Sequence, residues 1–128
     1  MIDKVAWLRV ENGRVLAARS HGKTAWYLPG GKREPGETDA ETLAREVAEE
    51  LAVEITPGSA ELTLTVETEA DGQPQLLRMA CYTAAYTGTI TPSAEIAEVA
   101  WLGYADRTRG SQAFRLVLDE LHSRGELH

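Results

Sequence analysis

Three glutamates, Glu46, Glu49 and Glu50, lie close together in a segment rich in helix-forming residues. An α-helix turns by about 100° per residue, so these side chains would share an arc of roughly 100° on one side of the helix. Like charges at this spacing repel one another by roughly a few tenths of a kcal/mol per pair. A bound cation would offset the repulsion, and carboxylate oxygens are ligands that Mg²⁺ and Mn²⁺ prefer.

The helix that would carry these glutamates has clear signals at its start. Thr38 is a good N-cap residue, and Glu41 follows at the spacing of a capping box. Apolar residues recur on the side opposite the glutamates: Ala40, Leu43, Ala44, Val47 and Leu51. We therefore expect a helix from Thr38 to about Leu51 that buries one side and presents carboxylates on the other.

The residues around this helix follow a long pattern with fixed spacing, G-x5-E-x7-R-E-U-x-E-E-x-G-U, in which U is a bulky aliphatic residue. The matching residues are Gly31, Glu37, Arg45, Glu46, Val47, Glu49, Glu50 and Val53. This pattern is the Nudix box, so the chain resembles the Nudix hydrolases, as do its Leu-Pro-Gly-Gly-Lys lead-in and its element order. Ala52 stands where the pattern has glycine, and an alanine forced into a left-handed helix exit costs about 1–2 kcal/mol.

The resemblance implies a metal site that acts on a diphosphate. Glu46 and Glu50 would be the main ligands of Mg²⁺ or Mn²⁺, supported by Glu49 and by the backbone carbonyl of Gly30. Such metals neutralise the charge that develops on the phosphates and activate a water for attack on phosphorus. Arg45 would hold a neighbouring glutamate, either Glu37 or Glu46, in its working orientation.

Family members often recruit one more carboxylate from a loop before a late strand, as ligand or general base. Glu95 and Glu98 both precede the expected strand over 99–102, and we favour Glu95 because it lies deeper in the loop. The catalytic residues that we predict are Glu49, Glu50, Arg45 and Glu95. The basic residues that we predict to contact substrate phosphates are Arg19, Lys23 and Lys32.

The rest of the chain alternates strand and turn signals. Strands are expected over 4–10, 14–19, 26–28, 61–69, 75–87 and 99–102, with turns at Asn12-Gly13, Pro29-Gly30-Gly31 and Asp71-Gly72 and a final helix after Gly110-Ser111. The order β-β-β-α-β-β-β-α predicts an α/β fold with a mixed sheet sandwiched between helices, which the resemblance also implies. A chain of 128 residues fits one domain, 1–128.

Composition limits the classes of partner. The formal net charge of −7 argues against a nucleic-acid-binding face, although a divalent metal can reverse the local field for a small phosphorylated substrate. No apolar stretch approaches the length of a membrane span, and the first residues do not resemble a signal peptide. Cys81 is the single cysteine, which fits a reducing compartment, so we expect a cytoplasmic protein.

The resemblance implies a metal-dependent pyrophosphohydrolase for a nucleoside diphosphate linked to another group, X. The small size and the likeness to the MutT group suggest a nucleoside triphosphate or an oxidised nucleotide as substrate. Two alternatives remain: a Nudix-like module that binds a nucleotide without hydrolysing it, and an isomerase of isoprenoid diphosphates, which would need a reactive cysteine. Homodimers are common in the family, although no interface is legible in the sequence.

Overall fold

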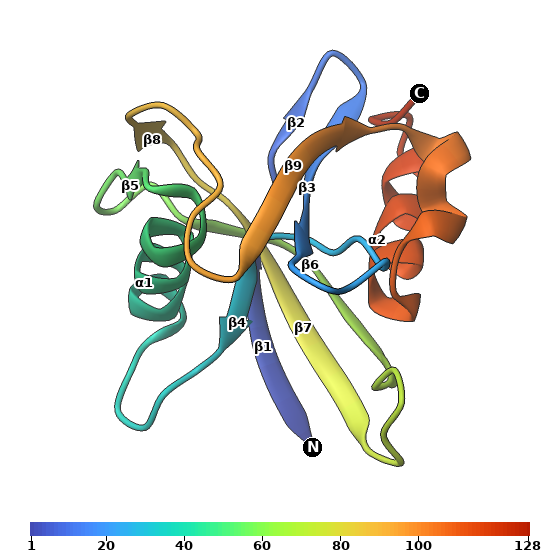
Figure 1. Ribbon diagram of the computed structural model, residues 1–128, viewed down its shortest axis with the longest axis horizontal. Coiled ribbons are helices and arrows are strands. Elements are labelled where there is room, and N and C mark those ends of the chain that lie inside the picture. The colour runs from blue at the N-terminus through green and yellow to red at the C-terminus, as the bar shows by residue number, and fades with distance from the viewer.

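The computed structural model describes residues 1–128, and its strands form a central layer with one helix on each side (Figure 1). The helices are α1, Asp39–Leu51, and α2, Gln112–Ser123, with a short 3-10 helix, η1, over Tyr104–Arg109. The strands are β1 Ile2–Trp7, β2 Val10–Glu11, β3 Arg14–Ser20, β4 Gly30–Lys32, β5 Glu54–Ile55, β6 Glu61–Glu69, β7 Leu76–Thr83, β8 Tyr86–Thr87 and β9 Ile96–Leu102. Neither helix is long and apolar enough to cross a membrane.

The main sheet has the strand order β4-β1-β7-β6 and is mixed. Strand β1 runs parallel to β7 and antiparallel to β4, and β6 is antiparallel to β7. A second, antiparallel sheet has the order β2-β3-β9, and β5 pairs with β8. The predicted α/β fold, with mixed β-structure between helices, is therefore confirmed.

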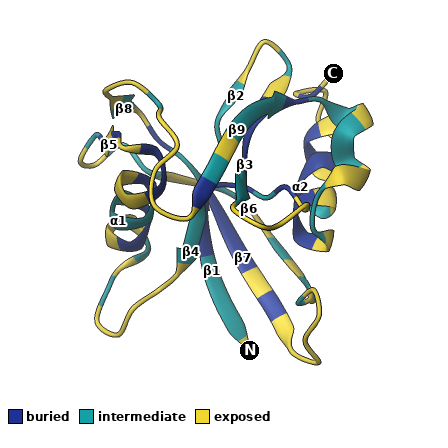
Figure 2. Ribbon diagram, viewed as in Figure 1, coloured by how far each residue is buried: buried dark blue, intermediate teal, exposed yellow.

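Two hydrophobic clusters hold the helices against the strands (Figure 2). The cluster under α2 contains 17 buried residues, among them Phe114 and Val117 from the helix and Met79 from β7. The cluster under α1 contains 9 buried residues, among them Leu43 and Val47. Each fully buried aliphatic or aromatic side chain contributes about 1.5–3 kcal/mol, so burial on both sides of the strands fixes the position of α1.

Several element boundaries differ from those expected from the sequence. The segment 4–10 breaks after Trp7, because the chain leaves β1 there and Val10–Glu11 pairs instead with β3. The segment 75–87 divides into β7 and β8, because the chain turns away from the main sheet to pair with β5. Strand β5 and the 3-10 helix η1 were not predicted, since both are short and carry no periodic pattern.

The Pro-Gly-Gly segment also differs from its expected form. Gly30 and Gly31, which we expected in a turn, instead begin strand β4, Gly30–Lys32, at the edge of the main sheet. The expected strand over 26–28 makes only isolated bridges, such as the one between Tyr27 and Ala18. The glycine signal was misleading here because a strand partner far away in sequence, β1, supplies the hydrogen bonds.

Helix α1 begins and ends as its sequence indicates. The Thr38 side chain accepts a hydrogen bond from the Glu41 amide, and the Glu41 carboxylate accepts one from the Thr38 amide, which completes the capping box. At the other end, Ala52 is left-handed, with φ 58° and ψ 31°. The chain therefore makes the exit that usually favours glycine, but with an alanine.

Replacing Ala52 with glycine is expected to raise the free energy of unfolding by about 0.5–1 kcal/mol, as measured by urea denaturation. Glycine removes the left-handed cost of about 1–2 kcal/mol, and its greater freedom in the unfolded chain returns part of that gain. Ala48 is the matched control, because it is an exposed alanine in the interior of α1, where glycine should lower stability by about 1 kcal/mol. Equal destabilisation by Ala52→Gly and Ala48→Gly would contradict this explanation.

Candidate metal and phosphate site

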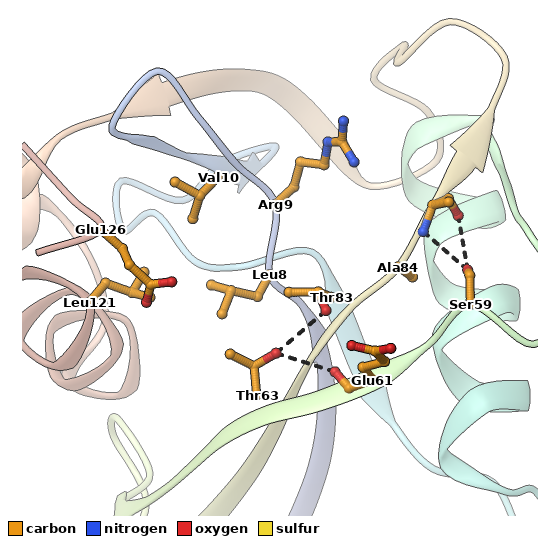
Figure 3. Close-up of a pocket in the computed structure, with 11 residues that line it drawn as sticks. Leu8, Arg9, Val10, Ser59, Glu61, Thr63, Thr83, Ala84, Leu121 and Glu126 are labelled. Atoms are coloured by element: carbon orange, nitrogen blue, oxygen red, sulfur yellow. Dashed lines mark hydrogen bonds between the residues drawn. The ribbon is translucent and has the colours of Figure 1, made fainter. Parts of the chain in front are cut away.

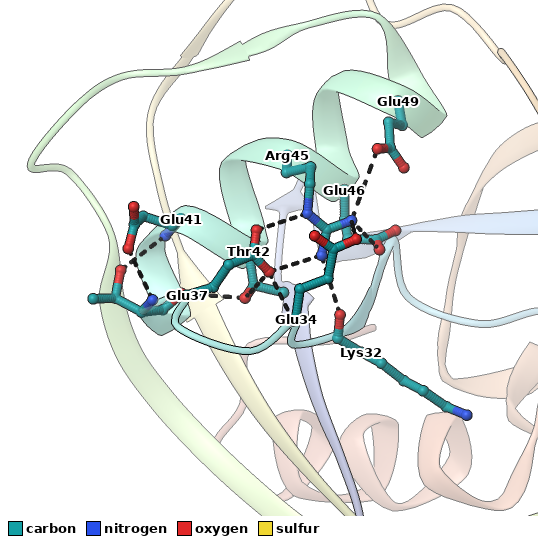
Figure 4. Close-up of polar contacts among 9 residues, drawn as sticks. Lys32, Glu34, Glu37, Glu41, Thr42, Arg45, Glu46 and Glu49 are labelled. Carbon is teal, nitrogen blue, oxygen red and sulfur yellow. Dashed lines mark hydrogen bonds and ion pairs between the residues drawn. The ribbon is translucent and has the colours of Figure 1, made fainter.

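Arg45, in the middle of α1, lies at the centre of a polar network (Figure 4). Its Nε donates to Glu37 Oε2 at 2.7 Å and its Nη2 donates to Glu37 Oε1 at 2.9 Å. Its Nη1 donates to Glu46 Oε1 at 2.8 Å, and Nη2 also reaches the Lys32 carbonyl at 3.2 Å. Charge-assisted bonds of this kind are about twice as strong as neutral ones, so Arg45 joins the loop, the edge strand β4 and the helix.

Glu37 accepts hydrogen bonds from several parts of this network. Besides the two bonds from Arg45, its Oε1 accepts hydrogen bonds from the Glu34 amide at 2.9 Å and from the Thr42 hydroxyl at 3.0 Å. The Arg45 guanidinium, followed by the Glu34 amide, lowers the pKa of Glu37 to about 2. Because these donors occupy both oxygens, Glu37 serves to position Arg45 and the loop.

Two glycines allow β4 to approach α1 closely. A Cβ atom on Gly31 would lie 2.5 Å from the carboxyl carbon of Glu46. A Cβ atom on Gly30 would lie 2.1 Å from the carbonyl oxygen of Val5, and the φ of Gly30 is 146°, which other residues rarely adopt. Any larger residue at these positions would therefore displace β4 or the Glu46 side chain.

Glu50 is the most deeply buried carboxylate of the chain, with 2% of its surface exposed. One of its oxygens accepts a hydrogen bond from the Gly30 amide at 2.8 Å. Burial raises the pKa of Glu50 to about 8, and the nearby charges of Glu46, Glu95 and Glu49 act in the same direction. Removing a charged carboxylate from water is costly unless a counter-charge is supplied, and a divalent cation would supply it.

The loop over 88–95 brings one more carboxylate to this place. The Thr91 amide donates to the Leu51 carbonyl and the Ser93 amide to the Glu50 carbonyl, both at 2.9 Å, which ties the loop to the end of α1. Glu95 then lies near enough to raise the pKa of both Glu46 and Glu50. Glu98 instead pairs with Arg19 at 2.8 Å.

Glu49 is the most exposed of the three helix glutamates, and its side chain is 54% exposed. Its Oε1 lies 3.8 Å from Arg45 Nη1, an i,i+4 contact that an ordinary solvated helix would also show. The structure contains no preformed group of three metal-ligating side chains, because Glu46 turns to Arg45 and Glu50 to Gly30. Each of those two contacts uses a single carboxylate oxygen, which leaves the second oxygen of Glu46 and of Glu50 as a donor of the kind that suits a hard divalent cation.

A cleft of about 360 Å³ lies on the other side of β4 from these glutamates and contains the predicted phosphate contacts Lys23 and Lys32. A smaller cavity of about 130 Å³ shares Lys4 and Tyr27 with this cleft and reaches the backbone of Gly30. The Tyr27 hydroxyl is bonded to Ser20, and burial raises the pKa of Tyr27, with Glu50 and Glu95 contributing. Tyr27 therefore lies between the cleft and the carboxylates.

Of the three basic residues predicted to contact phosphates, Lys23 and Lys32 line the cleft and Arg19 does not. Arg19 does not line the cleft, because its guanidinium is bound to Glu98 and to the carbonyls of Ser20 and Lys23. Lys4 lines the cleft but was not singled out in the sequence. A lysine inside an otherwise apolar strand was the available signal.

A larger cleft, of about 520 Å³, lies elsewhere, near the ends of β6 and β7 (Figure 3). Arg9, Glu61 and Glu126 are its charged residues, and none of the residues predicted from the Nudix box lines it. Its Arg9 is already paired with Glu11. The predicted metal and phosphate contacts therefore lie away from this larger cleft.

Replacing Glu37 with glutamine should lower the stability of the protein in a pH-dependent way. The native pKa of Glu37 lies near 2, below its ordinary value, so its ion pair contributes fully above about pH 4.5 and is lost as the pH falls toward 2. The difference in free energy of unfolding between wild type and Glu37→Gln, from urea titrations, should stay constant between about pH 5 and 8 and shrink below pH 4.5.

Glu54→Gln provides the control for this measurement, because Glu54 is an exposed carboxylate in β5 outside the network. A wild-type advantage over Glu37→Gln that persists unchanged down to pH 2 would show that the Glu37–Arg45 pair is not its source.

Comparison with known proteins identifies the family of the chain. The NUDIX domain family model matches residues 4–120. The chain is 35% identical over 88 residues to human 8-oxo-dGDP phosphatase NUDT18, which covers 68% of this chain and 26% of that protein. It is 37% identical over 62 residues to the CTP pyrophosphohydrolase of Escherichia coli (strain K12), which covers 45% of this chain and 46% of that one. The matched segments thus span less than half the length of either relative.

Solved structures show the same fold. The E. coli ORF135 protein superposes with a TM-score of 0.76 at 25% identity, over 96% of this chain and 89% of that chain. A MutT NUDIX hydrolase from Burkholderia pseudomallei superposes with a TM-score of 0.78 at 23% identity, over 94% of this chain and 97% of that chain. Because the family model spans nearly the whole chain and includes the helix with its glutamates, the chain belongs to the Nudix family.

Proposed function

We propose that this chain is a Mg²⁺- or Mn²⁺-dependent pyrophosphohydrolase that cleaves a nucleoside triphosphate or an oxidised nucleotide. The observation that carries the proposal is the position of Glu46 and Glu50, which are held against Gly30 and Gly31 beside a cleft lined with lysines. The names of the relatives, an 8-oxo-dGDP phosphatase and a CTP pyrophosphohydrolase, support a nucleotide as substrate.

In this proposal Glu46, Glu50 and Glu49, with the Gly30 carbonyl, hold the metal. The bound metal would neutralise charge on the reacting diphosphate and lower the pKa of the attacking water. Glu95 accepts the proton of that water as its oxygen attacks phosphorus, the P–O–P bond breaks, and the leaving phosphate takes the bridging oxygen. Arg45 does not touch the substrate but keeps Glu46 in place through its bond to Oε1.

The alternatives are less well supported. A module that binds nucleotides without turnover would have no use for a complete set of box carboxylates, each held in a defined contact. An isoprenoid diphosphate isomerase would need a reactive thiol, but Cys81 has 0% of its surface exposed. Burial also raises the pKa of Cys81 to about 12, so the thiol stays protonated and unreactive at neutral pH.

Replacing Glu50 with glutamine should reduce kcat at least about tenfold, which corresponds to about 1.4 kcal/mol of barrier. Glutamine keeps the oxygen that accepts from the Gly30 amide but loses the negative charge. Initial rates with Mg²⁺ on nucleoside triphosphates, dinucleoside polyphosphates and nucleotide sugars, with phosphate and pyrophosphate release measured separately, would check this. Glu54→Gln is the matched control, and a normal kcat in Glu50→Gln would refute the assignment of Glu50.

Chelation provides an independent test of the metal requirement. Activity should disappear in EDTA and return when Mg²⁺ or Mn²⁺ is added in excess, because the carboxylates alone cannot stabilise charge on a phosphate. Calorimetric titration of the apoprotein with Mn²⁺ should show one or more sites that Glu50→Gln weakens. Hydrolysis that continues undiminished in EDTA would exclude a metal-dependent mechanism.

A further inference from the structure

All three lysines of the chain, Lys4, Lys23 and Lys32, line the same cleft of about 360 Å³. None of them forms a salt bridge, whereas seven of the ten arginines do. In a chain with a net charge of −7, acidic partners are plentiful. The fold therefore gathers its lysines at one place and leaves them without ionic partners.

Two of these lysines are forced together by the sheet. Lys4 of β1 and Lys32 of β4 are directly opposite each other in the antiparallel register, so their side chains leave the same side of the sheet. Like charges in that arrangement destabilise a sheet. An anion held between the two ammonium groups would turn this repulsion into attraction.

Lys4 lies near several carboxylates, and Glu69 and Asp71 also line the cleft, but Lys4 forms a salt bridge with none of them. Its side chain is partly buried, and burial followed by the charge of Lys32 lowers its pKa. Asp71 and the glutamates Glu46 and Glu50 lie close enough to act in the opposite direction, but no carboxylate pairs with Lys4. Lys4 thus lines the cleft and is also near Glu46 and Glu50, the proposed metal ligands.

We propose that Lys4 and Lys32 hold a phosphoryl group of the substrate between them, with Lys23 adding a third contact, so that the cleft selects a chain of three phosphates. This inference rests on the proposed function and refines the identity of the group X. In a triphosphate, the metal would bind the two phosphates of the diphosphate that reacts, and the lysines would bind the third phosphate. A nucleotide sugar presents an uncharged sugar there, which would leave the Lys4–Lys32 pair uncompensated.

The central experiment replaces Lys4 with methionine, which keeps an unbranched side chain without the charge. We expect KM for the best nucleoside triphosphate to rise about tenfold with kcat changed less than about threefold, because a contact to a distant phosphate is made equally in ground and transition states. Lys4→Arg should restore most of the affinity. The selectivity between the triphosphate and the matching nucleoside diphosphate sugar, as the ratio of kcat/KM values, should fall by about the same factor.

Arg14→Met is the matched control for net charge, because Arg14 is exposed on β3 and lies outside the cleft. Its KM should stay within about twofold of wild type. Melting temperatures provide a control for folding: Lys4→Met should melt at or above the wild-type temperature, since it removes a like-charge pair.

A second readout does not depend on turnover or on the base. In EDTA, where metal bridges are absent, calorimetry should show that inorganic tripolyphosphate binds wild type about tenfold more tightly than it binds Lys4→Met, with Arg14→Met close to wild type. Equal binding to wild type and Lys4→Met, or an unchanged KM in a hydrolytically active Lys4→Met, would overturn the lysine proposal. Absence of hydrolysis in a wild type that binds tripolyphosphate through Lys4 would instead refute the proposed function alone.

Discussion

The ion pairs of Arg45 determine how the parts of this site meet. One guanidinium binds both oxygens of Glu37, one oxygen of Glu46 and the carbonyl of Lys32. These partners come from the loop before α1, from the helix itself and from the edge strand β4. Without this cation, Glu37 and Glu46 would repel each other, and of these polar contacts between β4 and the helix only the bond from the Gly30 amide to Glu50 would remain.

The second constraint is the close approach of β4 to β1 and to the Glu46 side chain of α1, which explains the two glycines in β4. Gly31 leaves room for the Glu46 carboxylate, and Gly30 allows the strand to pass the Val5 carbonyl while its amide binds Glu50. The result is a carboxylate buried among other carboxylates, an arrangement that is stable only with a proton or a cation nearby. Burial is the main reason that the pKa of Glu50 is raised to about 8.

The alternation of side chains along β4 separates the two kinds of charge. Gly31 turns toward α1 and its glutamates, whereas the next residue, Lys32, turns to the opposite side, where Lys4 and Lys23 also lie. Because β4 is an edge strand, the proposed phosphate chain would pass around it from the lysines to the carboxylates. The proposed metal-binding side and the proposed phosphate-binding side thus come from consecutive residues of one short strand.

Much of the site could be predicted from local sequence. The capping box of Thr38 and Glu41, the apolar side of α1 and the spacing of its glutamates are properties of one helix, and all appear in the structure. The form of the helix exit was left open by the sequence, because Ala52 replaces the usual glycine, and the structure shows a left-handed exit there. Helical periodicity reports these features because neighbouring turns of the same segment define them.

What remained hidden depends on contacts between distant segments. Gly30–Lys32 is a strand because β1 pairs with it, Arg19 is unavailable because β9 places Glu98 beside it, and Lys4 reaches the cleft through its register with Lys32. The sequence by itself determined which acidic side chains could bind a metal and how α1 would present them. Only the tertiary structure decided which charges are paired and which are left free, because strand register and long-range ion pairs have no local signature.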